Sequence, residues 1–289
     1  MQVTLEHVTH TYQEGSPFQS TAIRDISMTI REGEFLALIG HTGSGKSTLA
    51  QHINGLLRPT EGRVLLDGKD IHEKGCNKKE VRQKVGLVFQ YPEHQLFEET
   101  VAKDVAFGPK NLGLDEAEIK ERVREALQKV GLDPDAMEGR SPFELSGGQM
   151  RRVAMAGVLA MRPRILVLDE PAAGLDPQSR EEMLQLIYDL HRQGATVVMI
   201  SHSMDDVARF ATRAVVMEQG AIAMEGTPEE IFSHAEQLEK MGLDVPSVCK
   251  LSLRLKELGV ACPQDIFRED QAFHALLNLW KGEKAHGAQ

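Results

Sequence analysis

Residues Gly40 to Ser47, GHTGSGKS, have the G-x-x-x-x-G-K-S/T spacing of a phosphate-binding loop. They follow the apolar, β-branched run 35–39 and precede a helical pattern, which is the context that the motif requires. Glycines let backbone N–H groups surround phosphate oxygens, while Lys46 supplies charge to the β- and γ-phosphates and Ser47 supplies a hydroxyl to Mg²⁺. A nucleoside triphosphate is therefore expected at Gly40, His41, Thr42, Gly43, Ser44, Gly45, Lys46, Ser47 and Thr48.

Two adjacent carboxylates, Asp169 and Glu170, follow the apolar run 165–168. A carboxylate at the C-terminal end of a parallel strand lies where open α/β sheets bind ligands, so Asp169 can hold Mg²⁺ directly or through water. Glu170 is suited to orient or deprotonate an attacking water, and such general base assistance typically contributes about 10²–10⁴-fold. The alternative is an acidic pair that caps the next helix, and the phosphate-binding loop elsewhere in the chain favours the catalytic role.

Three further polar residues follow predicted strands. Gln90 closes the strand 85–89, His202 follows the strand 196–200, and Asp176 lies shortly after the acidic pair. Singly, a strand-end Gln or His is more often a satisfied polar residue, but a shared sheet edge favours contact with water, metal or phosphate. The expected metal ligands are Ser47, Gln90 and Asp169, and the expected catalytic residues are Glu170, His202 and Gln90.

A second glycine-rich turn, LSGGQ at Leu145 to Gln149, stands directly before a helical run at 150–161. Glycines that expose backbone N–H groups at a helix N-terminus favour an anion. This turn has no lysine, and Ser146 follows Lys46 by 100 residues. The two phosphate cradles therefore need not reach the same nucleotide.

Apolar runs and helical patterns alternate along the chain, which predicts an α/β layered fold with buried parallel strands. An inserted helix is expected from Asp115 to Val130, because Ile119, Val123, Leu127 and Val130 share one helical face. One further strand is predicted at residues 214–217. Further helices are predicted at residues 46–54, 177–193 and 204–210.

The C-terminal part contains a helix start at Thr227 to Glu230 and then two amphipathic stretches. On periodicity alone, these stretches fit either coverage of their own domain or dimerisation. Their apolar positions are Val248, Leu251, Leu255 and Leu258, then Phe273, Leu276, Leu277 and Trp280.

The net charge, the cysteines and the apolar stretches of the chain exclude several classes of protein. The 289 residues carry a formal net charge of −10, which argues against a protein that coats nucleic acid, since such binding needs Lys and Arg. Cys76, Cys249 and Cys262 lack disulfide or metal-ligand spacing, so free thiols in a reducing compartment are expected. No apolar stretch approaches the roughly 20 residues of a membrane span, and no signal-peptide pattern is present. A cytosolic protein, at most docked to a membrane partner, is expected.

The order of these motifs resembles the ATP-binding cassette (ABC) ATPase family over about residues 1–230. The resemblance implies a P-loop sheet core, an N-terminal antiparallel β-subdomain, an inserted helical subdomain at about 91–160, and a C-terminal helical dimerisation extension at 231–289. It implies ATP and Mg²⁺ as cofactors, and a Tyr12 ring stacked on adenine, a contact of about 1–3 kcal/mol in other base-binding sites. An edge-strand tyrosine without that role is the alternative.

In the ABC family two cassettes pack head to tail, and the signature turn of each covers the γ-phosphate bound by the other. The resemblance implies that Asp176 lies in the D-loop at this dimer contact, and that hydrolysis depends on closure of a two-site dimer. The signature residues expected to act on the partner's ATP are Ser146, Gly147, Gly148 and Gln149.

The segment FQYPEHQLFEETVAKDVAFGP, residues 89–109, is more distinctive than ATP chemistry requires. It resembles energy-coupling factor (ECF) transporter ATPases, which energise uptake of vitamins and related micronutrients through a membrane T-component and a substrate-binding S-component. Two other segments, 11–23 and 39–60, are similar to the second of the two paralogous ATPases. The resemblance implies that segment 92–97 and the helical face of the subdomain form a groove for the T-component, with a merely packed loop as the alternative.

The implied protein is a peripheral ATPase on the cytoplasmic side of the cell membrane, paired with a second ECF ATPase and without a nucleic-acid partner. The family's paired C-terminal extensions favour dimerisation for the tail, while homodimer and heterodimer both stay open. A related cobalt or nickel importer is the nearest alternative. A soluble, non-transport ABC ATPase is the alternative from another class, and the 100 residues between Lys46 and Ser146 leave no room for its long coiled coils.

Overall fold

The computed structural model describes residues 1–260, 263 and 266–286, and its centre is a six-stranded sheet. Strands β3, β6, β7, β8 and β9 pair in parallel, and β10 pairs antiparallel with β9. Their order in the sheet is β10-β9-β3-β8-β7-β6. The bounds are Phe35–Ile39 for β3, Val85–Val88 for β6, Ile165–Asp169 for β7, Thr196–Ile200 for β8, Arg213–Glu218 for β9 and Ala221–Gly226 for β10. The predicted α/β fold is confirmed.

Alternate side chains of the parallel strands enter two separate hydrophobic cores. In β3, Phe35 and Ala37 face one core, whereas Leu36 and Leu38 face the other. Side chains of a strand alternate between faces, so a sheet covered on both sides needs continuous apolar runs. The runs recognised in the sequence have this character because both faces are buried.

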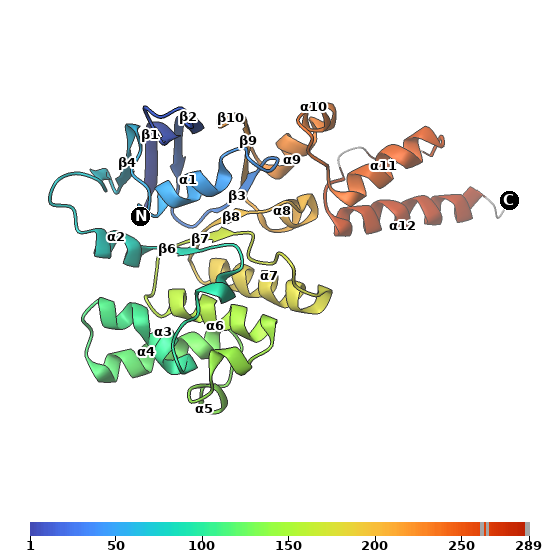
Figure 1. Ribbon diagram of the computed structural model, residues 1–289. Helices are drawn as coiled ribbons and strands as arrows, with labels where there is room; N and C mark the ends of the chain where they lie inside the picture. Colours follow the sequence, from blue (N-terminus) through green and yellow to red (C-terminus); the bar gives the residue numbers. More distant parts are fainter. Residues whose placement is uncertain (261–262, 264–265, 287–289) are drawn as a thin grey trace.

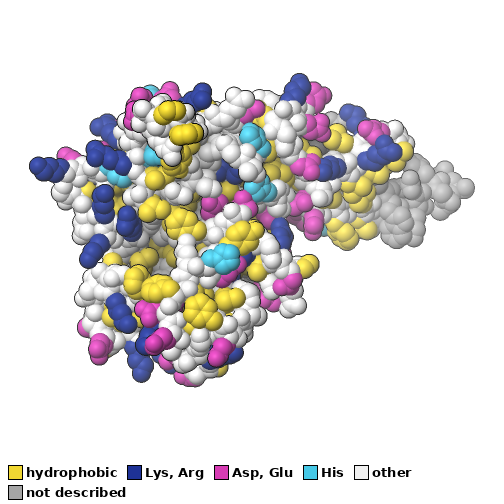
Figure 2. Space-filling model, in the orientation of Figure 1, with side chains coloured by type: hydrophobic (Ala, Val, Ile, Leu, Met, Phe, Trp, Pro, Cys, Tyr) yellow, Lys and Arg dark blue, Asp and Glu magenta, His cyan; other side chains and the backbone are white. Residues whose placement is uncertain are grey.

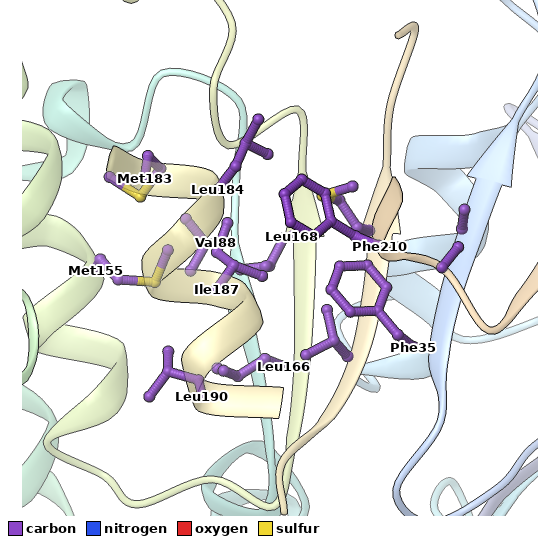
Figure 3. Packing of buried hydrophobic residues seen from close by; sticks show 14 of the residues in the cluster. Phe35, Val88, Met155, Leu166, Leu168, Met183, Leu184, Ile187, Leu190 and Phe210 are labelled. Atoms are coloured by element: carbon purple, nitrogen blue, oxygen red, sulfur yellow. The ribbon is translucent and has the colours of Figure 1, made fainter. Parts of the chain in front are cut away.

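One core lies between the sheet and the helices α6 (Gly147–Leu159), α7 (Pro177–Arg192) and α8 (Met204–Phe210). Figure 3 shows Leu166 and Leu168 of β7 pointing toward Ile187 and Leu190 of α7. These α7 side chains share a face because residues three and four apart in a helix are neighbours. The packing fixes β7, and therefore the residues that follow it, against the rest of the sheet.

The second core lies under a four-stranded antiparallel sheet ordered β2-β1-β4-β5. Its strands are β1 (Val3–Tyr12), β2 (Ser20–Ile30), β4 (Glu61–Leu66) and β5 (Lys69–Asp70). Helix α1 (Lys46–Ile53) packs into this core through Leu49, Ala50 and Ile53, and α2 (Lys78–Lys84) contributes Val81. The predicted N-terminal antiparallel subdomain is confirmed.

The inserted helices form a separate lobe on the other side of the six-stranded sheet (Figure 1). It contains η1 (Pro92–Gln95), α3 (Val101–Asn111), α4 (Glu116–Lys129), α5 (Pro134–Met137), η2 (Pro142–Glu144) and α6. Helix α4 matches the predicted helix, with Asp115 accepting from the Glu118 N–H at its N-terminus. Helix α3 was not predicted; it begins at the N-cap Thr100, whose side chain accepts from the Lys103 N–H.

The C-terminal helices project from the side of the molecule (Figure 1). They are α9 (Pro228–Phe232), α10 (Ala235–Lys240), α11 (Ser247–Glu257) and α12 (Glu269–His286). Val248 and Leu255 are half-buried, whereas Leu251, Leu258 and Phe273 are exposed. Hydrophobic side chains are visible on this extension in Figure 2. Cys262 and the Trp280 side chain lie outside the described residues and side chains, and the described cysteines, Cys76 and Cys249, are free thiols.

We expect Ile187→Ala to destabilise the protein by about 2–5 kcal/mol, because it opens a cavity where α7 packs on the sheet. The matched control is Gln185→Ala on the exposed face of the same helix, which should change stability by less than about 0.5 kcal/mol. Urea unfolding followed by circular dichroism measures both. Equal midpoints for the two variants would contradict the packing described here.

Candidate functional site

The side chains that follow β6, β7 and β8 meet at Glu170. Gln90 Nε2 donates to Glu170 Oε2 at 3.0 Å, and His202 Nε2 lies 2.8 Å from Glu170 Oε1. The contacts follow from the sheet order, because β7 lies between β6 and β8 and all three strands run parallel. Three residues predicted separately from the sequence are thus brought into one cluster.

The backbone at Glu170 is in the left-handed region, with φ of 49°. Its N–H donates to Ile200 O at 3.2 Å, so the turn is tied to the end of β8. Tyr91, directly after Gln90, also has a positive φ of 53°. Non-glycine residues in this region carry local strain, which persists where surrounding structure holds them and often marks functional sites. Both turns that deliver this cluster are therefore held under strain.

The loop Gly40–Gly45 has the shape of an anion cradle. Gly40 has φ of 151°, and a Cβ there would meet Met217 O at 2.3 Å. Gly45 has φ of 100°, and a Cβ there would meet Ala22 O at 2.6 Å. The buried Ser44 hydroxyl has no hydrogen-bond partner in the described part of the chain. Only glycine fits at these two positions. The Ser44 hydroxyl and the backbone N–H groups of the loop can donate hydrogen bonds to phosphate oxygens.

Lys46 lies under this loop and is almost fully buried. Its Nζ donates to Gly40 O at 2.7 Å and to His41 O at 2.9 Å. Burial lowers the pKa of Lys46, while the negative charges of Glu170 and Asp169 act in the opposite direction. The ammonium therefore lies against the backbone of the loop, close to the acidic pair.

The oxygen atoms around Ser47 fit a magnesium ion. Asp169 is 7% exposed and accepts a hydrogen bond from the Ser47 side chain. Burial raises the pKa of Asp169, so a nearby cation would stabilise its charged form. Gln90 directs its amide nitrogen to Glu170, which leaves its oxygen free for a metal. Within the described ranges no group of three His, Cys, Asp or Glu side chains could hold a metal, so phosphate and water oxygens would complete the shell.

Tyr12 closes β1 beside the same cradle. Its hydroxyl lies 3.2 Å from Thr48 Oγ1, and its ring is 39% exposed. The ring of His10 packs edge-on against it at 4.5 Å between centroids. The Tyr12 ring is therefore packed against His10 and remains partly exposed, so a nucleotide base could stack on it near the start of α1.

The signature turn lies in the helical lobe, away from the Glu170 cluster. Helix α6 begins at Gly147, so the prediction that helix starts at Met150 was wrong by one turn. The reason is a capping box, in which Ser146 Oγ accepts from the Gln149 N–H and the Gln149 side chain accepts from the Ser146 N–H. Ser146 and Gly147 remain exposed on the surface.

Asp176 caps the N-terminus of α7. Its Oδ1 accepts from the N–H groups of Gln178 at 3.1 Å and Ser179 at 3.0 Å. Hydrogen bonds from Ser179, through its side chain and backbone, lower the pKa of Asp176. The structure brings the start of α7 next to the signature turn, since a Cβ on Gly148 would lie 3.5 Å from Ser179 Oγ.

An apolar groove of about 480 Å³ opens on the helical lobe. Phe97 and Phe107 line the groove, and their rings contact each other edge to face with centroids 5.0 Å apart. The two residues are 58% and 47% exposed. Gly157 and Met161 also line the groove. The apolar face of α4 does not line this groove, because Val123, Leu127 and Val130 are buried in the hydrophobic core that the lobe shares with the central sheet. Segment 92–97 does contribute, through Gln95, Leu96 and Phe97.

Sequence reasoning missed a buried arginine that joins three parts of the site. Arg151 of α6 makes two hydrogen bonds to the Glu93 carboxylate, at 2.7 and 3.0 Å. It also donates to Pro171 O at 3.3 Å and Ala173 O at 2.5 Å, in the loop that follows Glu170. A planar guanidinium suits such a multiple contact. Arg151 and Glu93 are 58 residues apart, so no local pattern could reveal the pair.

The comparisons with known proteins agree with this geometry. A family model described as "ABC transporter" matches residues 23–173. The chain belongs to the ABC transporter ATPase family, and as a member it binds ATP and couples ATP hydrolysis to transport. The resemblance predicted from the sequence motifs is thereby confirmed.

Within that family, the similar curated relatives are energy-coupling factor transporter ATP-binding proteins EcfA2. The protein from Symbiobacterium thermophilum is 56% identical over 284 residues, covering 98% of each chain. The protein from Clostridium tetani is 52% identical, covering 98% of this chain and 99% of the relative.

Solved structures support the same fold. The cbiO1 protein from Clostridium perfringens, part of the ABC transporter complex cbiONQ, is 36% identical with a TM-score of 0.72. It covers 89% of this chain and 96% of that one. The cassette MJ0796, described as a dimer bound to ADP and Pi, is 33% identical with a TM-score of 0.69, covering 78% of this chain and 98% of that one.

We expect Glu170→Gln to preserve ATP binding and to lower the hydrolysis rate by about 10²–10⁴-fold, because the amide cannot accept a proton from water. Binding of a fluorescent ATP analogue and release of phosphate measure the two properties separately. Undiminished hydrolysis in this variant would reject the general-base role of Glu170.

Proposed function

We propose that this chain is the ATP-binding subunit of an ECF-type importer, in which ATP binding and hydrolysis close and open an ATPase dimer. The observation that carries the proposal is the full-length similarity to EcfA2 proteins, which includes the tail as well as the nucleotide motifs. Residues 1–230 then form the nucleotide-binding domain, with its helical subdomain at about 91–160, and residues 231–289 form the extension. Within the described residues no helix is long and apolar enough to cross a membrane. In this proposal the chain acts at the cytoplasmic side of the cell membrane, attached through partner subunits.

The composite nucleotide site is the second part of the proposal. One chain binds ATP through Tyr12 and the loop 40–48, with Mg²⁺ held by Ser47, Gln90 and Asp169. Gln90, Glu170 and His202 orient and activate the attacking water. The exposed Ser146 turn supports a role across a dimer, because it stands in the helical lobe while Lys46 stands at α1 in the opposite part (Figure 1). Ser146 to Gln149 of one chain would then stabilise the γ-phosphate bound by the other, with Asp176 at the contact.

The groove on the helical lobe is proposed to receive the coupling helices of a membrane T-component. Its exposed aromatic pair, Phe97 and Phe107, is an apolar surface of the kind that marks a docking site. The hydrogen bonds of Arg151 connect the segment that carries Phe97 to the loop after Glu170. Movement of a bound helix can therefore reach the catalytic residues through contacts present in the structure.

The transported micronutrient is chosen by an S-component in this proposal, with a vitamin as the expected class. The tail supports a dimer with a second ECF ATPase, since Leu251, Leu258 and Phe273 are exposed on one extension. A related cobalt or nickel importer is the second candidate, favoured by the likeness to cbiO1 from the cbiONQ complex. A soluble, non-transport ABC ATPase has less support, because the apolar groove would have no occupant.

We expect Ser146→Ala to reduce nucleotide trapping on the partner chain and to leave ATP binding by its own chain intact. Lys46→Ala should have the opposite pattern, since it removes the charge that binds the β- and γ-phosphates. Photolabelling with 8-azido-ATP, followed by separation of the two chains by size or tag, measures each site. A loss confined to the chain that carries Ser146→Ala would contradict the composite site.

We expect a tag on this chain to recover a second ATPase and two membrane proteins in mild detergent. Phe97→Asp with Phe107→Asp should release the membrane proteins and retain the second ATPase, because a charge in the groove opposes apolar docking. The control is Phe18→Asp, another exposed phenylalanine on the β1–β2 loop. Recovery of the chain alone, without any membrane protein, would count against the importer.

A further inference from the structure

Helices α7 and α8 both begin directly after residues of the proposed ATP site, and a partly buried ion pair joins their first turns. Arg180 Nη2 of α7 lies 2.5 Å from Asp206 Oδ2 of α8. The Asp206 side chain is 10% exposed. Arg180 stands four residues after Asp176, and Asp206 stands four residues after His202. The pair is therefore one helical turn away from each of two site residues.

The same pair lines a hollow together with two residues of the proposed catalytic cluster. The hollow, of about 150 Å³, is lined by Glu170, His202, Arg180 and Asp206 among other residues. The N–H of Asp206 also donates to Ser203 Oγ at 3.3 Å, and Ser203 is the residue next to His202. Displacement of the α8 first turn would therefore move His202 relative to Glu170.

The C-terminal extension also contacts α8. Asp205 accepts from the Ser247 N–H at 2.7 Å and from the Ser247 hydroxyl at 2.8 Å. Arg268 Nε donates to Ala208 O at 3.0 Å. Helix α8 has only seven residues, so its orientation depends on its contacts with α7 and with the extension more than on its own length.

We propose that Arg180 and Asp206 are positioning residues for ATP hydrolysis, whose ion pair holds the first turn of α8 against α7 and keeps His202 at Glu170. The pair does not touch the reacting atoms. It acts by preserving the 2.8 Å contact between His202 Nε2 and Glu170 Oε1, and small errors of placement at a catalytic group reduce the rate strongly.

The chain offers a matched control for this proposal. Arg209 of α8 and Glu181 of α7 form a second ion pair between the same two helices, with contacts of 2.5 and 2.8 Å. That pair is about half exposed and does not line the hollow behind Glu170. If ion pairing between α7 and α8 only stabilised the fold, both pairs would affect hydrolysis in proportion to stability.

The experiment compares Asp206→Asn, Arg180→Met, Arg180→Lys and the control Glu181→Gln in the complex purified through a tag on this chain. We expect Asp206→Asn and Arg180→Met to lower kcat about tenfold with the KM for ATP changed less than about twofold, since only transition-state geometry is disturbed. Arg180→Lys should recover part of the rate because it keeps the charge, and Glu181→Gln should retain kcat within about twofold. Thermal unfolding of each variant is measured alongside.

Two results would overturn the proposal. One is a kcat within about twofold of the wild type in Asp206→Asn and Arg180→Met. The other is a kcat that falls in proportion to the fraction of folded protein in every variant, including the control Glu181→Gln. If Asp206→Asn does not fold, the kcat of Arg180→Lys, which keeps the positive charge, is compared with the kcat of Arg180→Met, which removes it. The wild-type rate in the same preparation tests the ATPase activity independently, so its failure is distinct from failure of the ion-pair proposal.

Discussion

Glu170 has both of its carboxylate oxygens held from opposite sides, by Gln90 after β6 and by His202 after β8. This arrangement exists because β7 lies between those two strands and all three end at the same sheet edge. Residues 80 and 32 positions away from Glu170 in the chain are thereby placed within hydrogen-bond distance of it. The sheet order is therefore the constraint on which the proposed catalytic cluster depends.

The charges around this edge balance one another at close range. Lys46 is buried beside two carboxylates, and Asp169 is buried with a pKa raised by that burial. Groups in such surroundings favour ligands of complementary charge, and a triphosphate with a divalent cation supplies both signs. The strained turns at Tyr91 and Glu170 add to this picture, because they hold side chains at the edge in fixed directions. The proposed binding and catalytic roles thus rest on one set of opposed charges.

Local signals made most of the scaffold and the nucleotide motifs predictable. The five parallel strands of the central sheet were predicted within one residue of their bounds, because parallel strands buried on both faces are continuous apolar runs. Helix α3 was missed, since Gly108 and Pro109 lie inside it and are usually read as helix breakers. The start of α6 was misplaced because two glycines obscured the Ser146 capping box. The contacts of Arg151 and Arg180 join distant segments, and such contacts leave no trace in local periodicity.

The central claim is that a complete ATP site needs a second chain. A structure of the Glu170→Gln variant with ATP and Mg²⁺ tests it most directly. We predict that the Lys46 ammonium then contacts the phosphates, and that the Ser146 hydroxyl of a facing chain lies at hydrogen-bond distance from the γ-phosphate. A triphosphate enclosed by one chain alone, with no Ser146 turn from another molecule against it, would contradict the account.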